Sequence, residues 1–436
     1  MNLFGTMNVR ENNLFVGGIN TLELVKKFGT PLYVMDEEQI RDNCRRYMKA
    51  MGAKMNDNKV AYAGKAFLTK AIVQVMKNEG LCLDVVSGGE IYTAIVSEFP
   101  MDKVYFHGNN KTIEEIKLGI KAGVGTFIVD NMMELENINN ICEVYGKTQD
   151  ILLRIIPGIE AHTHEYIKTG QIDSKFGFTL LEDNIFRVVK SISELENINL
   201  KGLHCHIGSQ IFDIEPYREA VRIMINLMNN INNHFEISMT ELNLGGGFGI
   251  YYGEGDDPKT IEEYCAGILN EVESCSRKLQ MKNPNIIIEP GRSIVGNSGI
   301  TLYTIGGVKE IPNIKKYVSV DGGMTDNIRP SLYSAQYQGL IANNVENNEE
   351  AMVTISGKCC ESGDVLINDI SLPKVKKGDI LAVLSTGAYC YSMSSNYNKI
   401  PKAPVVLVGK LGPRLICKRE TYEDMLRNEL LNDKLI

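Results

Sequence analysis

Lys65 is the residue whose type and position are most informative in this 436-residue chain. It lies near the end of the apolar run 60–66, which predicts a strand, and a helical pattern starts at Thr69. Parallel α/β folds build their active sites at the carboxyl ends of strands. A lysine in a partly desolvated site of this kind loses its proton more readily and attacks aldehydes. Taken alone, the position of Lys65 favours an ordinary surface lysine over a catalytic one.

Polar residues also follow seven further predicted strands. They are Asp84 with 87–90 after the second, His107 to Lys111 after the third, Asp130 after the fourth, Arg154 on the fifth, His204 to Ser209 at the sixth, 245–249 after the seventh, and Glu289 to Arg292 at the eighth. The ends of parallel strands meet at one edge of a sheet, so these groups are expected to converge on a single pocket.

The residue types at these strand ends suit a phosphate-bearing aldehyde. The glycine-rich turn 245–249 lets backbone N–H groups approach a phosphate, and the Ser209 hydroxyl adds a donor. Glu289 could hold a pyridine nitrogen protonated, and the flat imidazole of His206 could stack on a ring. With Lys65, these groups describe a pyridoxal 5'-phosphate site. A tight turn, a capping glutamate and a core histidine would explain each alone, but not their convergence.

The elements that would position these groups alternate between strands and helices. The predicted strands are 60–63, 81–86, 103–106, 125–129, 151–156, 200–206, 241–244 and 286–289. Amphipathic helices lie between them, one of them begun by a capping box of Thr112 and Glu115. Eight such units over about 250 residues fit a (β/α)8 TIM-type barrel. A doubly wound open sheet is the alternative, since a strand count cannot show closure.

The pattern changes near Glu289. Strands are expected at 300–305, 316–320, 352–356, 380–384 and 405–408, separated by turns and without alternating helices. The strand-like segments 14–16 and 31–34 could join them, and 421–430 predicts a closing helix. We therefore expect a PLP-binding (β/α)8 barrel over 36–290. A mostly β domain, of the barrel or sandwich kind, would combine 1–35 with 291–436.

Composition excludes several classes of protein. The formal net charge of −8 comes without a polybasic patch, which argues against nucleic acid and anionic membranes as partners. Residues 1–5 carry no signal-peptide pattern, and no apolar run approaches the roughly 18 residues of a membrane span. We therefore expect a cytoplasmic protein.

Cysteine and histidine spacing gives no sign of a metal. The ten cysteines are scattered, apart from the adjacent Cys359 and Cys360, and no C-x-x-C occurs. The pairs His162 with His164 and His204 with His206 lack carboxylates or cysteines at ligand spacing. We expect free thiols in a reducing compartment and no metal.

Five motifs carry a family resemblance along almost the whole chain. They are His107-Gly108-Asn109-Asn110-Lys111, His162-Thr163-His164-Glu165-Tyr166, Ser174-Lys175-Phe176-Gly177, Glu289-Pro290-Gly291-Arg292 and Cys360-Glu361-Ser362-Gly363-Asp364. The chain resembles the fold-type III pyridoxal-phosphate decarboxylases, and most closely the diaminopimelate decarboxylases among them. The resemblance implies a barrel plus a β domain, and a head-to-tail homodimer with shared active sites.

The resemblance also implies a role for individual residues. Lys65 would form the Schiff base with the cofactor, His206 would stack on its ring, and Glu289 would pair with the pyridine nitrogen. The full cofactor-binding set would be Lys65, Asp84, Arg154, His206, Ser209, Gly245, Gly246, Gly247, Glu289, Pro290, Gly291, Arg292 and Tyr389.

The implied substrate is meso-2,6-diaminopimelate, which would be converted to L-lysine and CO2 in the last step of lysine biosynthesis. Its binders would be Arg292, Arg329, Tyr333, Glu361 and Tyr389. Arginine forks suit a carboxylate, and a glutamate suits the distal ammonium. Cys360 of the partner subunit would return a proton to the α-carbon, since a thiol has a tunable pKa. The alternative for Cys360 is a buried structural thiol.

Three rival functions remain open at this stage. One is a decarboxylase of the same family acting on ornithine, arginine or carboxynorspermidine, which would have no use for Arg329 and Tyr333 in these roles. Another is a racemase of the same fold type, which the motif around Cys360 disfavours. The third is a non-catalytic pyridoxal-phosphate carrier, which would typically be a lone barrel.

Overall fold

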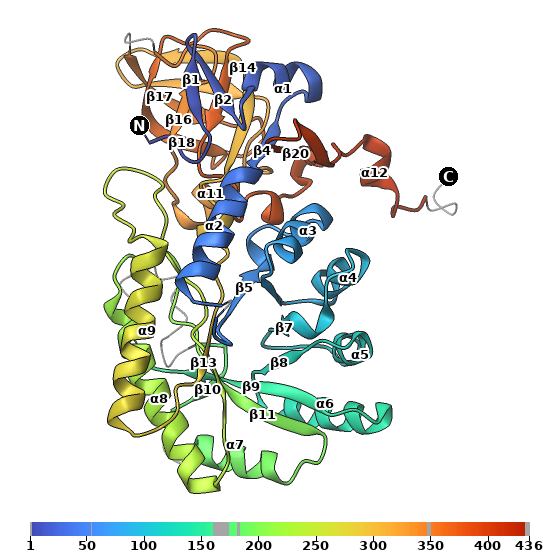
Figure 1. Cartoon of the computed structure of the whole chain (residues 1–436). Coiled ribbons are helices and arrows are strands. Elements are labelled where there is room, and N and C mark those ends of the chain that lie inside the picture. Colours follow the sequence, from blue (N-terminus) through green and yellow to red (C-terminus); the bar gives the residue numbers. More distant parts are fainter. Residues whose placement is uncertain (1, 54, 160–173, 181–183, 347–349, 432–436) are drawn as a thin grey trace. The chain divides into compact units, whose positions relative to one another are not determined.

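The computed structural model describes residues 2–53, 55–159, 174–180, 184–346 and 350–431, and its chain forms two compact units (Figure 1). One, the barrel unit, comprises residues 41–250 and 256–294. The other, the β unit, comprises residues 1–40, 251–255 and 295–436.

The barrel unit contains a closed ring of eight parallel strands. In sequence order they are β5 (Lys59–Ala63), β6 (Cys82–Val85), β7 (Val104–Phe106), β8 (Thr126–Val129), β9 (Gln149–Ile156), β11 (Ile198–His204), β12 (Glu241–Asn243) and β13 (Asn285–Ile288). Each strand pairs with the next, and β13 pairs back with β5 through Ile287 opposite Lys59. This last pairing confirms the TIM-type barrel and excludes the open sheet. The two-residue strand β10 (Phe178–Thr179) pairs with β9 outside the ring.

Helices cover the outside of the ring (Figure 1). They are α3 (Lys70–Asn78), α4 (Gly88–Val96), α5 (Ile113–Ala122), α6 (Met132–Tyr145), α7 (Asn184–Ser193), α8 (Glu215–Phe235) and α9 (Ile261–Lys278), with α2 (Glu37–Ala50) before β5 and the short α10 (Arg292–Val295) after β13. Thr112 and Glu115 form the predicted capping box at the start of α5. Such side-chain caps end the loop and begin the helix at a defined residue, which limits the loop's freedom.

The inside of the ring is filled by side chains from neighbouring strands. Ala61, Cys82, Tyr105, Ile128, Leu152 and Ile287 form one buried cluster, each from a different strand. At Gly202, where the β9–β11 register shifts, the backbone of β12 comes so close that an added Cβ would lie 1.7 Å from the Glu241 carbonyl oxygen. A glycine is therefore required there for the ring to close at this distance.

We predict that Gly202→Ala destabilises the barrel by about 3 kcal/mol, because the new methyl group must push β11 and β12 apart. Urea unfolding followed by circular dichroism measures the effect. Gly307→Ala in the β unit is the matched control, since an added Cβ there meets no atom within 4 Å. Equal unfolding midpoints for the two variants would contradict the prediction.

The β unit is built mainly from strands. They are β1 (Asn8–Arg10), β2 (Asn13–Val16), β3 (Ile19–Asn20), β4 (Leu32–Asp36), β14 (Gly299–Ile311), β15 (Lys315–Val320), β16 (Gly339–Ile341), β17 (Glu350–Ser356), β18 (Val365–Pro373), β19 (Ile380–Val383), β20 (Val405–Val408) and β21 (Arg414–Cys417). The large sheet has the order β18-β17-β15-β14-β4-β20-β21, and β19 joins β14 to β16. The mostly β character expected for this part of the chain is confirmed.

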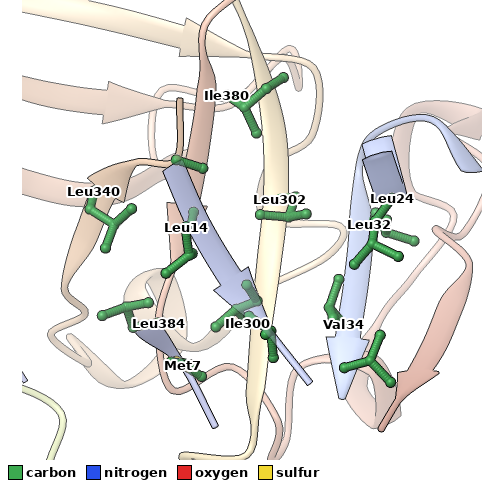
Figure 2. Packing of buried hydrophobic residues seen from close by; sticks show 14 of the residues in the cluster. Met7, Leu14, Leu24, Leu32, Val34, Ile300, Leu302, Leu340, Ile380 and Leu384 are labelled. Carbon is green, nitrogen blue, oxygen red and sulfur yellow. The ribbon is translucent and has the colours of Figure 1, made fainter. Parts of the chain in front are cut away.

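An apolar core holds the N-terminal strands against the C-terminal ones (Figure 2). Leu14 of β2 and Leu32 and Val34 of β4 pack in one cluster with Ile300 and Leu302 of β14. Met7, Leu24, Leu340, Ile380 and Leu384 complete the labelled set. The strands nearest the N-terminus thus belong to the same core as β14 and β19.

Three details of this unit differ from expectation. Helix α1 (Thr21–Phe28), capped by Asn20, was not predicted between the two N-terminal strands. Strand β18 was missed because the Asn368-Asp369 pair within it resembles a turn, and Asp369 does have a φ of 47°. The closing helix α12 (Tyr422–Leu426) ends before residue 430. Within the described residues, no helix is both long and apolar enough to cross a membrane.

Candidate active site

A cavity of about 360 Å³ lies at the carboxyl ends of the barrel strands. It is lined by Lys65, Asp84, Val86, His107, Gly108, Asn109, Arg154, Phe176, His204, His206 and Glu289. Five of the residues singled out for cofactor binding are therefore brought together within the barrel unit: Lys65, Asp84, Arg154, His206 and Glu289.

A second cavity of about 490 Å³ lies at the opposite end of the ring, beside Lys59, Cys82 and Tyr105. There the Lys59 amine donates to Glu241 at 2.5 Å and to the Tyr105 hydroxyl at 3.0 Å. Because Glu241 and Tyr105 already engage the Lys59 amine, we interpret Lys59 as structural. We therefore place the chemistry at the cavity that contains Lys65.

Lys65 occupies the 3-10 turn Gly64–Ala66 directly after β5, and its side chain is exposed. The turn is held on both sides. The Tyr62 hydroxyl donates to the Phe67 carbonyl at 2.6 Å, and the Ala63 N–H donates to the Pro290 carbonyl at 3.2 Å. Gly291 packs so tightly that an added Cβ would lie 2.9 Å from the Ala63 Cβ. Pro290 and Gly291 therefore contribute to the position of the lysine turn.

Two buried carboxyl groups face the cavity, and their pKa values shift in opposite directions. Burial raises the pKa of Asp84, and the charge of Glu289 adds to that effect. Burial also acts to raise the pKa of Glu289, but His107 and His204 outweigh it and hold this pKa well below its usual range. Nε2 of His107 lies 2.8 Å from one carboxylate oxygen of Glu289. Glu289 is therefore the carboxyl group of the two whose charged form is favoured.

A hydrogen-bonded chain ties Glu289 to the glycine turn. The Asn243 side chain donates to Glu289 at 2.7 Å and accepts from the Gly245 N–H at 2.9 Å. The Glu289 N–H donates to the Gly245 carbonyl at 2.7 Å. Among the described residues the N–H of Gly247 has no acceptor, so it is free to meet an anion. Gly247 has a φ of +99°, and an added Cβ would lie 2.3 Å from the Gly208 carbonyl oxygen.

His206 and Ser209 follow β11 beside this turn. Nδ1 of His206 accepts from the Gly246 N–H at 3.3 Å, which fixes the ring orientation. Burial lowers the pKa of His206 well below its usual value, and the charges of Lys65 and Arg154 lower it further. The imidazole is therefore neutral.

The buried side chain of Arg292 reaches the same region of the barrel unit, donating to the Ser209 hydroxyl at 2.8 Å. Ser209, which is expected to bind the phosphate, is thus joined to Arg292, which is expected to bind both cofactor and substrate. The arrangement is suited to anions, because a charged donor polarises the hydroxyl and supplies positive potential.

Arg154 extends from β9 between a ring and a carboxyl group. Its guanidinium carbon lies 4.2 Å from the centroid of Phe176, and its Nε lies 4.0 Å from Asp130. Burial lowers the pKa of Arg154, which Asp130, Glu289 and Asp84 partly offset. Arg154 supplies the positive charge opposite these carboxyl groups.

Two contributors were not assigned a role from the sequence. Phe176 belongs to a motif quoted for the family resemblance, but nothing in the sequence indicated its stacking on Arg154. Asn243 could have been singled out from its place within the predicted strand 241–244, because an amide inside a barrel strand needs hydrogen-bond partners, and its side chain is fully buried. The motif His162-Thr163-His164-Glu165-Tyr166 lies outside the described residues.

The remaining expected residues lie in the β unit. Arg329 and Tyr333 are on α11 (Arg329–Tyr333), where Arg329 is buried and donates to the hydroxyls of Tyr337 at 2.5 Å and Tyr252 at 3.1 Å. No carboxylate of the described β unit forms an ion pair with Arg329. Tyr389 has a φ of +61° in the loop after β19.

Cys360 and Glu361 are exposed on the loop between β17 and β18. Asp364 holds this loop by accepting from the N–H groups of Met324 at 2.6 Å and Cys359 at 2.7 Å. The Cys360 N–H donates to Asn398 at 2.7 Å. Burial, aided by Asp364, raises the pKa of Cys359 to about 11. Cys359 therefore forms the reactive thiolate less readily than an ordinary cysteine does.

His107, His204 and Glu289 also bring possible metal-ligand atoms within 4.8 Å of one another. Sequence spacing could not predict this group, because its members follow three different strands. We interpret it as a hydrogen-bonded group, since His204 and Asn243 both pair with the carboxylate of Glu289.

Comparison with known proteins agrees with this site. The family described as "Pyridoxal-dependent decarboxylase, pyridoxal binding domain" matches residues 37–296. The chain belongs to the pyridoxal-dependent decarboxylase family. It is 47% identical to the diaminopimelate decarboxylase of Bacillus subtilis (strain 168) over 431 residues, covering 99% of this chain and 98% of that protein. It is 44% identical to that of Staphylococcus aureus (strain COL), covering 97% and 99%.

Solved structures give the same result for this decarboxylase. A crystal structure of diaminopimelate decarboxylase from M. jannaschii has a TM-score of 0.93 at 38% identity, covering 99% of both chains. The Helicobacter pylori enzyme complexed with L-lysine has a TM-score of 0.86 at 32% identity, covering 94% of this chain and 99% of that one. The expected resemblance is confirmed.

The chain is therefore a pyridoxal-phosphate-dependent amino-acid decarboxylase. The barrel unit fits that cofactor, because the cavity is lined by the amine of Lys65 and the carboxylate of Glu289. The glycine turn is joined to Glu289 through Asn243, and the N–H of its Gly247 has no acceptor among the described residues. The volume of the cavity is also in the usual range for small-molecule sites.

We predict that His204 of this decarboxylase stays neutral between about pH 5 and 8. Burial lowers its pKa to about 4, although Glu289 acts in the opposite direction. Nitrogen NMR of protein labelled at histidine would then contain one imidazole signal that does not titrate and disappears in His204→Gln. Titration of that signal near neutrality would contradict the prediction.

Proposed function

We propose that this decarboxylase converts meso-2,6-diaminopimelate to L-lysine and CO2, the last step of lysine biosynthesis. The observation that carries the proposal is the cavity of the barrel unit, where Lys65, Glu289 and Arg154 meet in a chain similar to diaminopimelate decarboxylases over nearly its full length. Relatives at this level of identity support the substrate as well as the cofactor.

Cofactor binding would use the residues gathered at the strand ends. Lys65 would attach the cofactor covalently, because it supplies an amine at the cavity. The turn at Gly247, together with Ser209, would hold the phosphate, and His206 would cover one face of the ring. Glu289, the ionised carboxylate, would face the ring nitrogen. When bound, pyridoxal phosphate supplies an electron sink for the bond to the departing carboxylate.

Substrate recognition would use two arginines and an exposed acid. Arg329 supports this because it is a buried guanidinium held by hydroxyls, with N–H groups left for a carboxylate. Arg292 lies beside Ser209 and would act on the same substrate, with Tyr333 and Tyr389. The exposed Glu361 would hold the distal ammonium, which a substrate without a second amine lacks.

Proton return to the α-carbon would come from Cys360. Its exposure on a loop fixed by Asp364 and Asn398 supports a thiol offered to a second subunit. We therefore propose a homodimer in which each active site takes Cys360 from the partner.

The substrate assignment predicts that purified protein with cofactor releases CO2 and lysine from meso-diaminopimelate, and little CO2 from ornithine or arginine. The physical reason is the distal carboxylate of meso-diaminopimelate, which would pair with the buried guanidinium of Arg329. Ornithine and arginine have no such carboxylate, so they would leave the charge of Arg329 unpaired. Trapped CO2 and chromatography of the amino acids measure both products. Comparable CO2 from ornithine would refute the assignment.

The shared site predicts complementation between two inactive variants. Lys65→Ala and Cys360→Ala should each lose most activity, whereas refolding them together should restore about a quarter of the parent activity, since half of randomly formed dimers would carry one intact site. Cys359→Ala is the control and should remain active. If the mixture stays as inactive as its components, Cys360 does not act across subunits.

A further inference from the structure

Glu289 is a buried carboxylate whose two oxygens meet different donors. Oε1 accepts a bond of 2.7 Å from Nδ2 of Asn243, and Nε2 of His107 lies 2.8 Å from the same oxygen. Oε2 has a longer contact of 3.3 Å with Nε2 of His204. Oε1 is therefore well engaged, whereas Oε2 keeps capacity for a group in the cavity.

The surroundings restrict both Asn243 and His204 to the donor role. The amide oxygen of Asn243 already accepts from the Gly245 N–H at 2.9 Å, so its NH2 group faces Glu289. His204 is neutral, because burial lowers its pKa to about 4. Its proton must lie on Nε2 to bond the carboxylate, and Nδ1 has no hydrogen-bond partner among the described residues.

The other charged groups near Glu289 leave it as the anion. Asp84 on β6 has a raised pKa, caused by burial and offset in part by His107. Arg154 and Lys65, which also line the cavity, contribute positive charge. His107 packs edge-on against His204, with ring centroids 4.9 Å apart, and so supports its orientation.

We propose that Asn243 and His204 are positioning residues that keep Glu289 ionised and aim its Oε2 at the ring nitrogen of the cofactor, so that the proton stays on that nitrogen. The inference rests on the proposed pairing of Glu289 with this nitrogen. A carboxylate and a pyridine in a buried site compete for one proton, and donors to the carboxylate stabilise its charged form. Removing a donor raises the proton affinity of Glu289 and draws the proton from nitrogen to oxygen.

Two substitutions test the donors separately. Asn243→Asp keeps an acceptor for the Gly245 N–H but replaces the donor to Oε1 by a carboxylate oxygen. His204→Leu removes the donor to Oε2. Each protein is loaded with pyridoxal phosphate labelled with ¹⁵N in the ring, and the nitrogen signal is recorded without substrate. The parent should have the signal of a protonated pyridine, and the variants that of an unprotonated or exchanging one.

Kinetics provide a second readout for the same variants. We expect kcat to fall about tenfold with little change in KM, because one hydrogen bond to a charged group is lost and the substrate binders are untouched. Asn226→Asp on the exposed face of α8 is the control for the same chemical change, and should keep the parent signal and kcat.

The outcomes separate this inference from the proposed function. A ring signal that stays protonated in both variants at saturating cofactor would overturn the inference, even if meso-diaminopimelate is the substrate. A signal that moves in one variant assigns the role to that donor. Because the signal is recorded without substrate, a wrong substrate assignment leaves this result intact.

Discussion

Hydrogen bonding between β13 and β5 is the constraint on which the barrel unit depends. This pairing turns a row of parallel strands into a ring, so that every strand's carboxyl end opens on the same rim. Lys65 after β5 and Glu289 after β13 are far apart in sequence, yet the closing pair makes their strands neighbours. Without closure, the amine and the carboxylate would lie at opposite edges of an open sheet.

Electrostatics then differentiates groups that the fold brings together. Asp84 and Glu289 are both buried carboxyl groups near one cavity. Burial raises the pKa of Asp84, whereas His107 and His204 lower the pKa of Glu289 by more than burial raises it. A buried carboxylate is costly unless donors stabilise it. The charge of Glu289 is therefore stabilised by two histidines that line the same cavity.

Much of this architecture could be predicted from the sequence because it depends on local patterns. Strand alternation, the Thr112 capping box and the polar residues at strand ends all act over a few residues. Asn243 and Phe176 could not be assigned in that way, since their partners Glu289 and Arg154 lie far from them in the sequence. Helix α1 was missed because two strand-like segments frame a helix of only eight residues.

Asn243 joins the glycine turn to Glu289 through one rigid amide, which is hydrogen-bonded to both. Under the proposed mode of cofactor binding, occupancy of the turn by the phosphate and alignment of the carboxylate would therefore be thermodynamically linked. A ligand that engages both ends gains more than the sum of its two halves. Pyridoxal without its phosphate would lose affinity at the distant ring nitrogen as well as at the turn. Such linkage would let the pocket discriminate between pyridoxal and pyridoxal phosphate more strongly than the phosphate contacts alone would.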